Sequence, residues 1–278
     1  MLFRSYMFEQ GIGNFIVCGK IITFNSPIHM INRINTELAP YFIPYQTKRN
    51  TWVLRNAPCQ GNIYRYTSFT NLLSILEGRL YLSPRLAFSD RRELGEYTSE
   101  YIKVCYKNIV DKNRKKFRQK VIDNFRLSTY FNVSCWTMEC KESFPMWKAY
   151  KGDEISVRIK TDIHSLLASI KDADINLYCG PMNYGEEEDR IEMRDILFKK
   201  TEEYSDEKEY RIYVIKEEYD LSASPSPMLL SINPEELIHE IYFSPFVHRS
   251  KILDLCKLLA HKYPFIESKL NYSDLIEY

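Results

Sequence analysis

Long apolar runs are missing from this 278-residue chain, and no stretch of about 18 apolar residues could cross a membrane as a helix. The first residues do not read as a signal peptide, because Glu9 and Gln10 interrupt the apolar stretch and no small-residue cleavage site follows. An excess of one charge is also missing, since 38 Lys and Arg residues face 37 Asp and Glu residues. The sequence therefore predicts a cytoplasmic protein without membrane contact and without a chain-wide attraction to nucleic acid.

Several catalytic signatures are absent as well. The chain has no phosphate-binding GxxxxGK[ST] loop, no GxGxxG loop and no GxSxG motif, which argues against NTPases, Rossmann enzymes and serine hydrolases. The five histidines are isolated, and the seven cysteines form no CxxC pair. We therefore expect reduced thiols and no metal site.

What is present is an aromatic-rich chain, with 21 Tyr and 15 Phe, that is long enough to bury a core without covalent staples. Residues 1–60 are punctuated by proline and are interpreted as an N-terminal extension or small accessory element, and residues 61–278 as the main domain. Alternation and apolar spacing predict an α+β fold. The expected strands cover 62–67, 79–83, 129–136, 155–159, 175–183, 209–216, 228–232 and 240–243, and the expected helices 69–77, 97–127, 144–150, 161–170, 234–238 and 248–261.

Four ordered motifs resemble a widespread bacterial family of unknown function. They are YRYTSFTNLLSILEGRLYLS from Tyr64, SCWT from Ser134, MWKAY from Met146 and EKEYR from Glu207. The INPEELIHEIYFSP segment fits the same family, so the resemblance covers roughly residues 61–275.

The same order is similar to the ADP-ribosyltransferase fold, in which a first strand carries His or Arg, a later strand a Ser-Thr-Ser-like element, and a catalytic Glu lies near the end. Arg65, Ser134 and the Glu207-Lys208-Glu209 triplet follow in that order. The resemblance implies split mixed or antiparallel sheets with peripheral helices. It also implies NAD as co-substrate, no metal, and transfer of ADP-ribose to nucleic acid (RNA or DNA) or protein. A bacterial toxin or antiphage defence effector, with a cognate antitoxin or inhibitor as a further partner, fits this picture.

The resemblance assigns roles to individual residues. Glu209 would stabilise the positive charge that builds on the ribose when the nicotinamide bond breaks, and Glu207 would orient the acceptor. The residues expected to bind NAD are Tyr64, Arg65, Tyr66, Thr67, Tyr81, Ser134 and Thr137. Purely structural alternatives stay open. In one, Glu209 is a solvated strand-edge charge paired with Arg211 or Lys208, and in the other the tyrosines are core residues. Strand alternation also puts Tyr64 and Tyr66 on one face and Arg65 on the other.

A basic stretch within 97–127 gives a second reading. The cations singled out are Lys112, Arg114, Lys115, Lys116 and Arg118, and such a run could follow a phosphate backbone. The chain would then be a non-enzymatic nucleic-acid-binding or sensor module. A third reading is an NAD glycohydrolase, in which water accepts the ADP-ribose.

Overall fold

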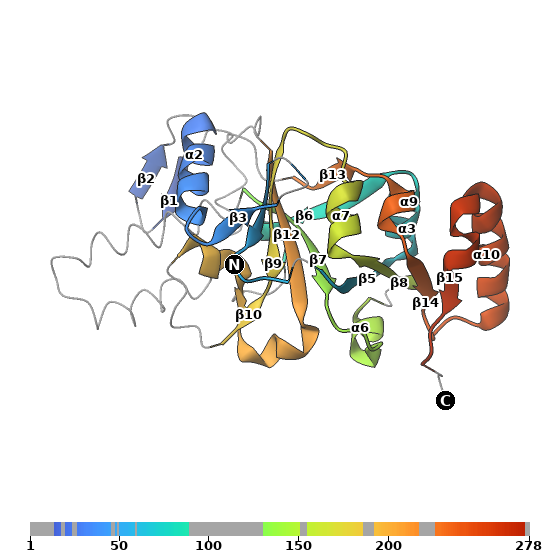
Figure 1. Cartoon of the computed structure of the whole chain (residues 1–278). Coiled ribbons are helices and arrows are strands. Elements are labelled where there is room, and N and C mark those ends of the chain that lie inside the picture. Colours follow the sequence, from blue (N-terminus) through green and yellow to red (C-terminus); the bar gives the residue numbers. More distant parts are fainter. Residues whose placement is uncertain are drawn as a thin grey trace.

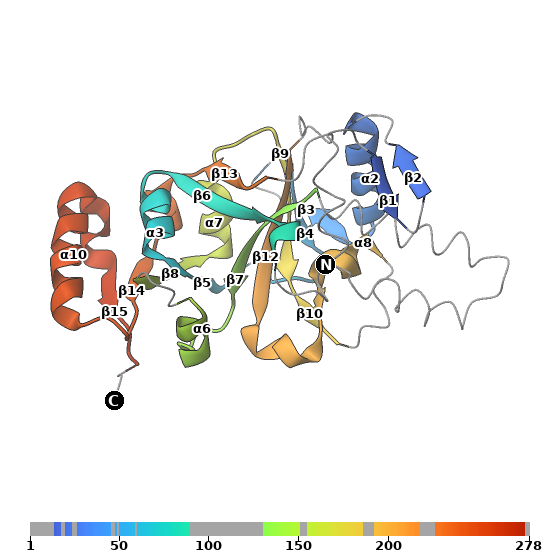
Figure 2. The same cartoon turned by 180° about the vertical axis from the view of Figure 1, so that it is seen from behind.

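The structure is a computed structural model, and it describes residues 14–17, 20–23, 27–45, 48, 50–58, 60–88, 130–150, 155–185, 192–216 and 226–275. Over these residues the fold is α+β, as the sequence predicts, with helices around one large mixed, mostly antiparallel sheet. In Figures 1 and 2 the sheet runs across the middle of the molecule, from α10 at one end to α2 at the other. The helical region expected over 97–127, with its basic residues, lies outside the described residues.

Eleven strands of the described chain form the main sheet. Nine follow in the spatial order β15 (Leu270–Tyr272), β14 (Glu240–Phe243), β8 (Ser156–Asp162), β5 (Asn62–Ser68), β7 (Asn132–Thr137), β12 (Glu209–Lys216), β9 (Ile175–Pro181), β4 (Thr51–Leu54) and β3 (Phe42–Pro44). Only the β14–β15 and β4–β9 pairs along this order are parallel. Because β4 pairs with β9, part of the expected N-terminal extension joins the main sheet, while the domain boundary near residue 60 stays a prediction.

The sheet forks at β7. The strand β5 pairs with β7 at a single position, Tyr64 opposite Thr137. At the other end of β7, the strand β6 (Arg79–Pro84) pairs through Ser83 opposite Val133, and β6 in turn pairs with β13 (Met228–Ser231). The middle of β7, around Ser134, therefore faces the fork between β5 and β6.

Two hydrophobic cores cover the two faces of the sheet. Helices α3 (Phe69–Leu76), α7 (Ile163–Ser169), α9 (Pro234–Leu237) and α10 (Arg249–Lys262) pack in the first core, which includes Ile212. Helices α2 (Pro27–Leu38) and α8 (Met193–Phe198) pack in the second, which includes Tyr213. Successive residues of β12 thus enter different cores, which explains why this strand is buried on both faces.

Short elements complete the described chain. They are the hairpin of β1 (Asn14–Val17) and β2 (Lys20–Thr23), the pair β10 (Asn183–Tyr184) and β11 (Lys199–Lys200), helix α6 (Phe144–Ala149), and the 3-10 helices η1 (Arg85–Ala87), η3 (Glu202–Glu207) and η4 (Pro264–Lys269). Figure 1 places α6 and η3 at the same lower edge of the molecule.

Capping residues set where the helices begin. The Ser68 side chain accepts the N–H of Asn71 at 3.2 Å and starts α3 at Phe69, where the sequence predicts that a helix begins. Ser143 does the same for α6, with Pro145 in the first turn. The sequence does not predict helix α2, because prolines punctuate residues 1–60. Pro27 instead stands in the first turn of that helix, where a missing N–H costs nothing.

A close approach of two backbones predicts an effect of Gly180 in β9. A Cβ atom added there would lie 2.7 Å from the Cβ of Leu54 in β4. Gly180→Ala should therefore lower the free energy of unfolding by about 1–3 kcal/mol, measured by urea denaturation. Leu54→Gly removes the opposing Cβ, so the two changes together should cost less than their sum; strict additivity would contradict this contact.

Candidate functional site

Three neighbouring strands carry the residues that the sequence singled out. Arg65 lies on β5, Ser134 on β7 and Glu209 at the start of β12, in the spatial order β5-β7-β12. Residues paired directly across strands share a face, so Glu209 lies on the face of its partner Thr137. Ser134 pairs with Ile212 and lies on the opposite face.

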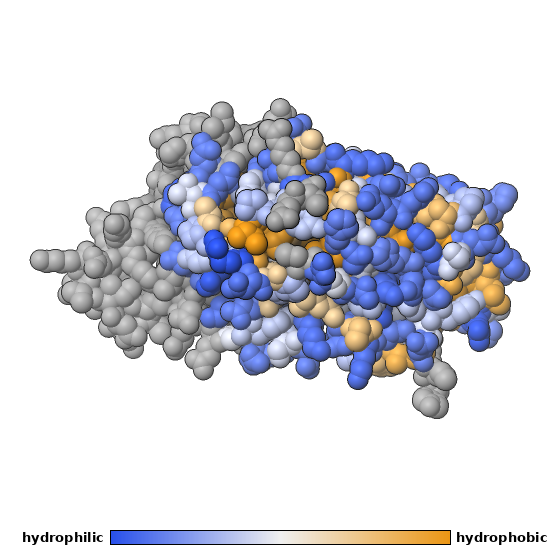
Figure 3. Space-filling model, viewed as in Figure 1, coloured by the Kyte–Doolittle hydropathy of each residue, from blue (hydrophilic) through white to orange (hydrophobic). Residues whose placement is uncertain are grey.

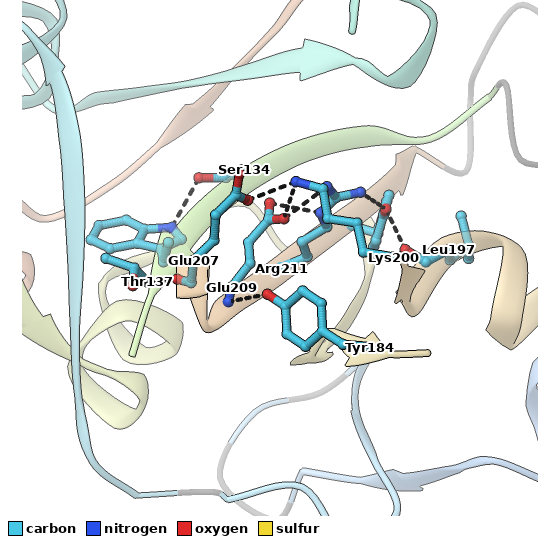
Figure 4. Close-up of polar contacts among 10 residues, drawn as sticks. Ser134, Thr137, Tyr184, Leu197, Lys200, Glu207, Glu209 and Arg211 are labelled. Atoms are coloured by element: carbon cyan, nitrogen blue, oxygen red, sulfur yellow. Dashed lines mark hydrogen bonds and ion pairs between the residues drawn. The ribbon is translucent and has the colours of Figure 1, made fainter. Parts of the chain in front are cut away.

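A buried ion network surrounds Glu209, whose exposed fraction is 6%. Its carboxylate accepts a two-pronged contact from Arg211, from Nε to Oε1 at 2.7 Å and from Nη2 to Oε2 at 2.8 Å. The Lys200 Nζ lies 3.3 Å from the same Oε2 and 2.6 Å from Oε2 of Glu207. Figure 4 shows these side chains converging beside β7. Two cations therefore hold two carboxylates, which balances the charge of the group and favours ionised Glu209.

A turn brings the two carboxylates together. Lys208 adopts the left-handed conformation, with φ of 42°, between the end of η3 and the start of β12. The Thr137 hydroxyl donates to the Glu207 carbonyl at 2.6 Å, and the Glu209 N–H donates to the Tyr184 hydroxyl at 2.7 Å. Burial raises the pKa of Tyr184 to about 12, so this phenol stays neutral and can accept that hydrogen bond.

A second polar group lies on the far side of β7. The Arg65 guanidinium donates to the Ser134 hydroxyl through Nη1 and to the Tyr81 carbonyl through Nη2 at 3.2 Å. Trp136 Nε1 also donates to the Ser134 hydroxyl, at 2.9 Å, and its ring lies 5.7 Å from the Arg65 guanidinium carbon. Arg65 and Ser134 thus contact each other, on the opposite face of the sheet from Glu209. The Arg65 guanidinium therefore links β5 to both β6 and β7.

A further aromatic residue, Tyr150, comes directly after α6. Its ring is 44% exposed and lies roughly parallel to that of Tyr66, with centroids 6.3 Å apart. Burial raises the pKa of its phenol, Cys135 and the two carboxylates raise it further, and Arg65 lowers it. Arg65 and the two carboxylates therefore have opposing effects on the pKa of this phenol.

Three more residues expected to bind NAD, Tyr64, Tyr66 and Thr67, make contacts within the protein. The Tyr64 and Tyr66 rings are buried against Arg158 on β8, whose guanidinium carbon lies 3.8 Å and 5.5 Å from their centroids. The Tyr66 hydroxyl accepts the Ser143 N–H at 3.0 Å, and the Thr67 hydroxyl accepts from the Asn71 side chain at 3.0 Å. Their roles in NAD binding stay predictions, and their burial favours the core alternative.

Three residues of this region were missed by sequence reasoning. Lys200 lies nine positions before Glu209 and reaches it only because β11 folds back. Arg158 is buried and donates to the carbonyls of Glu139 and Cys140 at 2.8 and 2.9 Å, fixing the segment that leads into α6. Tyr150 is half-exposed, whereas Trp147, three residues before it, is buried. For the ion network as a whole, the sequence offered one signal, the spacing of Glu209 and Arg211, because residues two apart on a strand share a face.

Acid should weaken one contact beside the site. Lys208 pairs with Glu139, and the hydrogen bond from Lys208 lowers the pKa of that carboxyl to about 2. Because the folded pKa lies below the usual 4.5, this stabilisation is present above about pH 4.5 and is lost as the pH falls towards 2. The difference in unfolding midpoint between the native chain and Glu139→Gln should shrink across that window; a pH-independent difference would contradict the pairing.

Comparisons with known proteins add no assignment: no protein-family model matches the chain, and no curated protein matches it. Within the described residues, no helix is long and apolar enough to span a membrane. The same residues hold no group of three or more His, Cys, Asp or Glu side chains placed to bind a metal ion. The five cations of the predicted nucleic-acid site, Lys112, Arg114, Lys115, Lys116 and Arg118, lie outside the described residues.

Proposed function

We propose that the chain is an NAD-consuming ADP-ribosyltransferase that modifies a macromolecule, in the setting of a bacterial toxin or antiphage effector. The observation that carries the proposal is the pair of carboxylates, Glu207 and Glu209, held by one lysine at the start of a central strand. The order of Arg65, Ser134 and Glu209 on adjacent strands, in a sheet that forks at β7, supports the split-sheet resemblance.

The chemistry needs a fixed negative charge. Cleavage of the nicotinamide–ribose bond places positive charge on the ribose, and an immobile carboxylate in a site with little water stabilises that charge without reorganisation. Arg211 and Lys200 hold Glu209 in one position and keep it ionised, which is the preorganisation that the role requires. Glu207 is more exposed than Glu209, with a third of its side-chain surface accessible, and would contact the acceptor.

Arg65 also has a structural part in this proposal, and its role in NAD binding stays a prediction. Because its guanidinium bonds Ser134 and the Tyr81 carbonyl, we assign it to holding the fork of the sheet in shape beside the NAD site.

The proposal is tested with NAD labelled in its adenylate part. The purified chain is incubated with this NAD and with separate pools of protein, RNA and DNA, beside Glu209→Gln and the matched control Lys200→Gln. Label in one pool, lost in Glu209→Gln, is the expected result. Free ADP-ribose without labelled macromolecule would instead favour the glycohydrolase, and no loss of NAD in any pool would overturn both enzymatic readings.

A further inference from the structure

An aromatic pair lies at the start of α6, and one of its two rings is largely exposed. Phe144, the first residue of α6, keeps 49% of its surface exposed, and its ring meets that of Phe246 edge-on, with centroids 5.3 Å apart. Figure 3 shows apolar side chains among hydrophilic ones at the lower edge of the molecule, where Figure 1 places α6. An exposed large aromatic ring on a short surface helix is a candidate contact for a partner.

Three cations border this pair. Lys148 lies four residues after Phe144 on α6 and is exposed, so the two share the outer side of the helix. Lys141 is exposed in the segment before the helix. Arg249, also exposed, follows Phe246 closely and lies over the Tyr272 ring at 4.6 Å. We call Lys141, Phe144, Lys148, Phe246 and Arg249 the α6 surface.

The carboxylates next to the α6 surface leave it positive. Glu142 accepts from Trp147 Nε1 at 2.8 Å, from the Asp274 N–H at 3.1 Å and from the Ser273 hydroxyl. Its charge is therefore turned towards the protein. These contacts also hold the residues after β15 against the start of α6, so Arg249 and Phe144 belong to one continuous region. Asp274 is exposed and opposes the three cations, whereas the Glu139 carboxylate, which accepts the Lys141 N–H at 3.0 Å, is paired with Lys208.

We propose that the α6 surface binds single-stranded nucleic acid. Every base has a flat face that stacks on an aromatic ring whatever the sequence, and lysine and arginine side chains pair with the phosphates between bases. A duplex hides its base faces and fits exposed rings poorly. Protein interfaces are depleted of lysine around their aromatic centres, so the mixture of two rings with three cations favours nucleic acid over a protein partner.

The position of α6 links this surface to the proposed chemistry. Helix α6 carries Phe144 at its start, and the segment before it contacts the turn between Glu207 and Glu209, because the Met138 N–H donates to the Lys208 carbonyl at 2.9 Å and Lys208 pairs with Glu139. A strand bound along α6 would therefore lead an acceptor base or ribose towards the carboxylates. This last step rests on the proposed transferase function, whereas the binding itself does not.

The test measures binding without NAD. Fluorescence anisotropy of labelled 12-nucleotide RNA and DNA single strands is compared with that of a duplex, using the full chain. Phe144→Ala should weaken single-strand binding about tenfold, which is the loss of one stacked base. Lys148→Gln should reduce the slope of log affinity against log salt by about 0.7, the value for one phosphate contact on a single strand. The matched controls on α10, Leu258→Ala and Lys257→Gln, should change neither.

Several outcomes would overturn the inference. Unchanged affinity in Phe144→Ala would place binding elsewhere, and a loss on neutralising Lys112, Arg114, Lys115, Lys116 and Arg118 alone would place it on the basic stretch. Absence of single-strand binding, or preference for the duplex, would remove the surface altogether. Label transfer to protein without single-strand binding would support the transferase and refute this surface. Single-strand binding without any use of NAD would support this surface and refute the transferase.

Discussion

Glu209→Gln should lower transfer of label from NAD by at least about a hundredfold, the usual loss when a group that stabilises transition-state charge is removed. The glutamine keeps the shape of the side chain and can still accept one hydrogen bond from Arg211. It no longer offers the negative charge that a ribosyl cation requires. The measurement is single-turnover label transfer at saturating NAD, so that weaker NAD binding is separated from slower chemistry.

Lys200→Gln is the matched control for this effect. It removes one cation from the same network but leaves the two-pronged contact between Arg211 and Glu209 in place. We expect a loss of about tenfold or less. If Glu209→Gln and Lys200→Gln lose activity equally and melt equally early, the network is structural and Glu209 has no direct role in the reaction.

Arg211→Met should lower the free energy of unfolding by about 3–5 kcal/mol, because it leaves the Glu209 carboxylate buried with one partner removed. Arg211 is itself buried and also donates through Nη1 to the Tyr213 hydroxyl at 2.9 Å, which in turn donates to the Leu197 carbonyl at 2.5 Å. The loss therefore reaches into the second core. Urea denaturation monitored by tryptophan fluorescence measures it.

The double variant Glu209→Met/Arg211→Met, compared with the two single variants, completes a double-mutant cycle for the ion pair. Replacing both charges by apolar side chains of similar length should recover much of the stability, since an apolar pair needs no compensation and Lys200 keeps Glu207 as its partner. A single-variant loss below about 1 kcal/mol would mean that the pair behaves like a solvated surface ion pair, against its burial in the structure.

Local patterns were enough to predict most of the elements. The Ser68 cap, the alternation of Arg79–Pro84 and the β-branched run of β12 each act within a few residues, and the structure confirms the elements that they indicate. Helix α2 was missed because proline was weighed as a breaker, although Pro27 occupies the one helical turn that tolerates it.

The candidate site was only partly predictable. Glu209 and Arg211 share a face by simple alternation, so their pairing was one of the alternatives at the outset. The contact of Lys200 was not, because it depends on the left-handed turn at Lys208 and on how β11 packs. That Arg65 and Glu209 approach β7 from opposite sides depends on strand register, which a single sequence does not specify.

The fork at β7 also bears on how the chain folds. Thr137 is paired with Tyr64 on one side and with Glu209 on the other, so neither pairing is local in sequence. Contacts of such separation form only after long loops have closed, and topologies built on them fold slowly. The charges of Lys200 and Arg211 lose their water when β12 docks, and we therefore expect the ion network to form late in folding. Changes in that network should then speed unfolding far more than they slow folding, so the lifetime of the native chain depends on the same four side chains as its proposed chemistry.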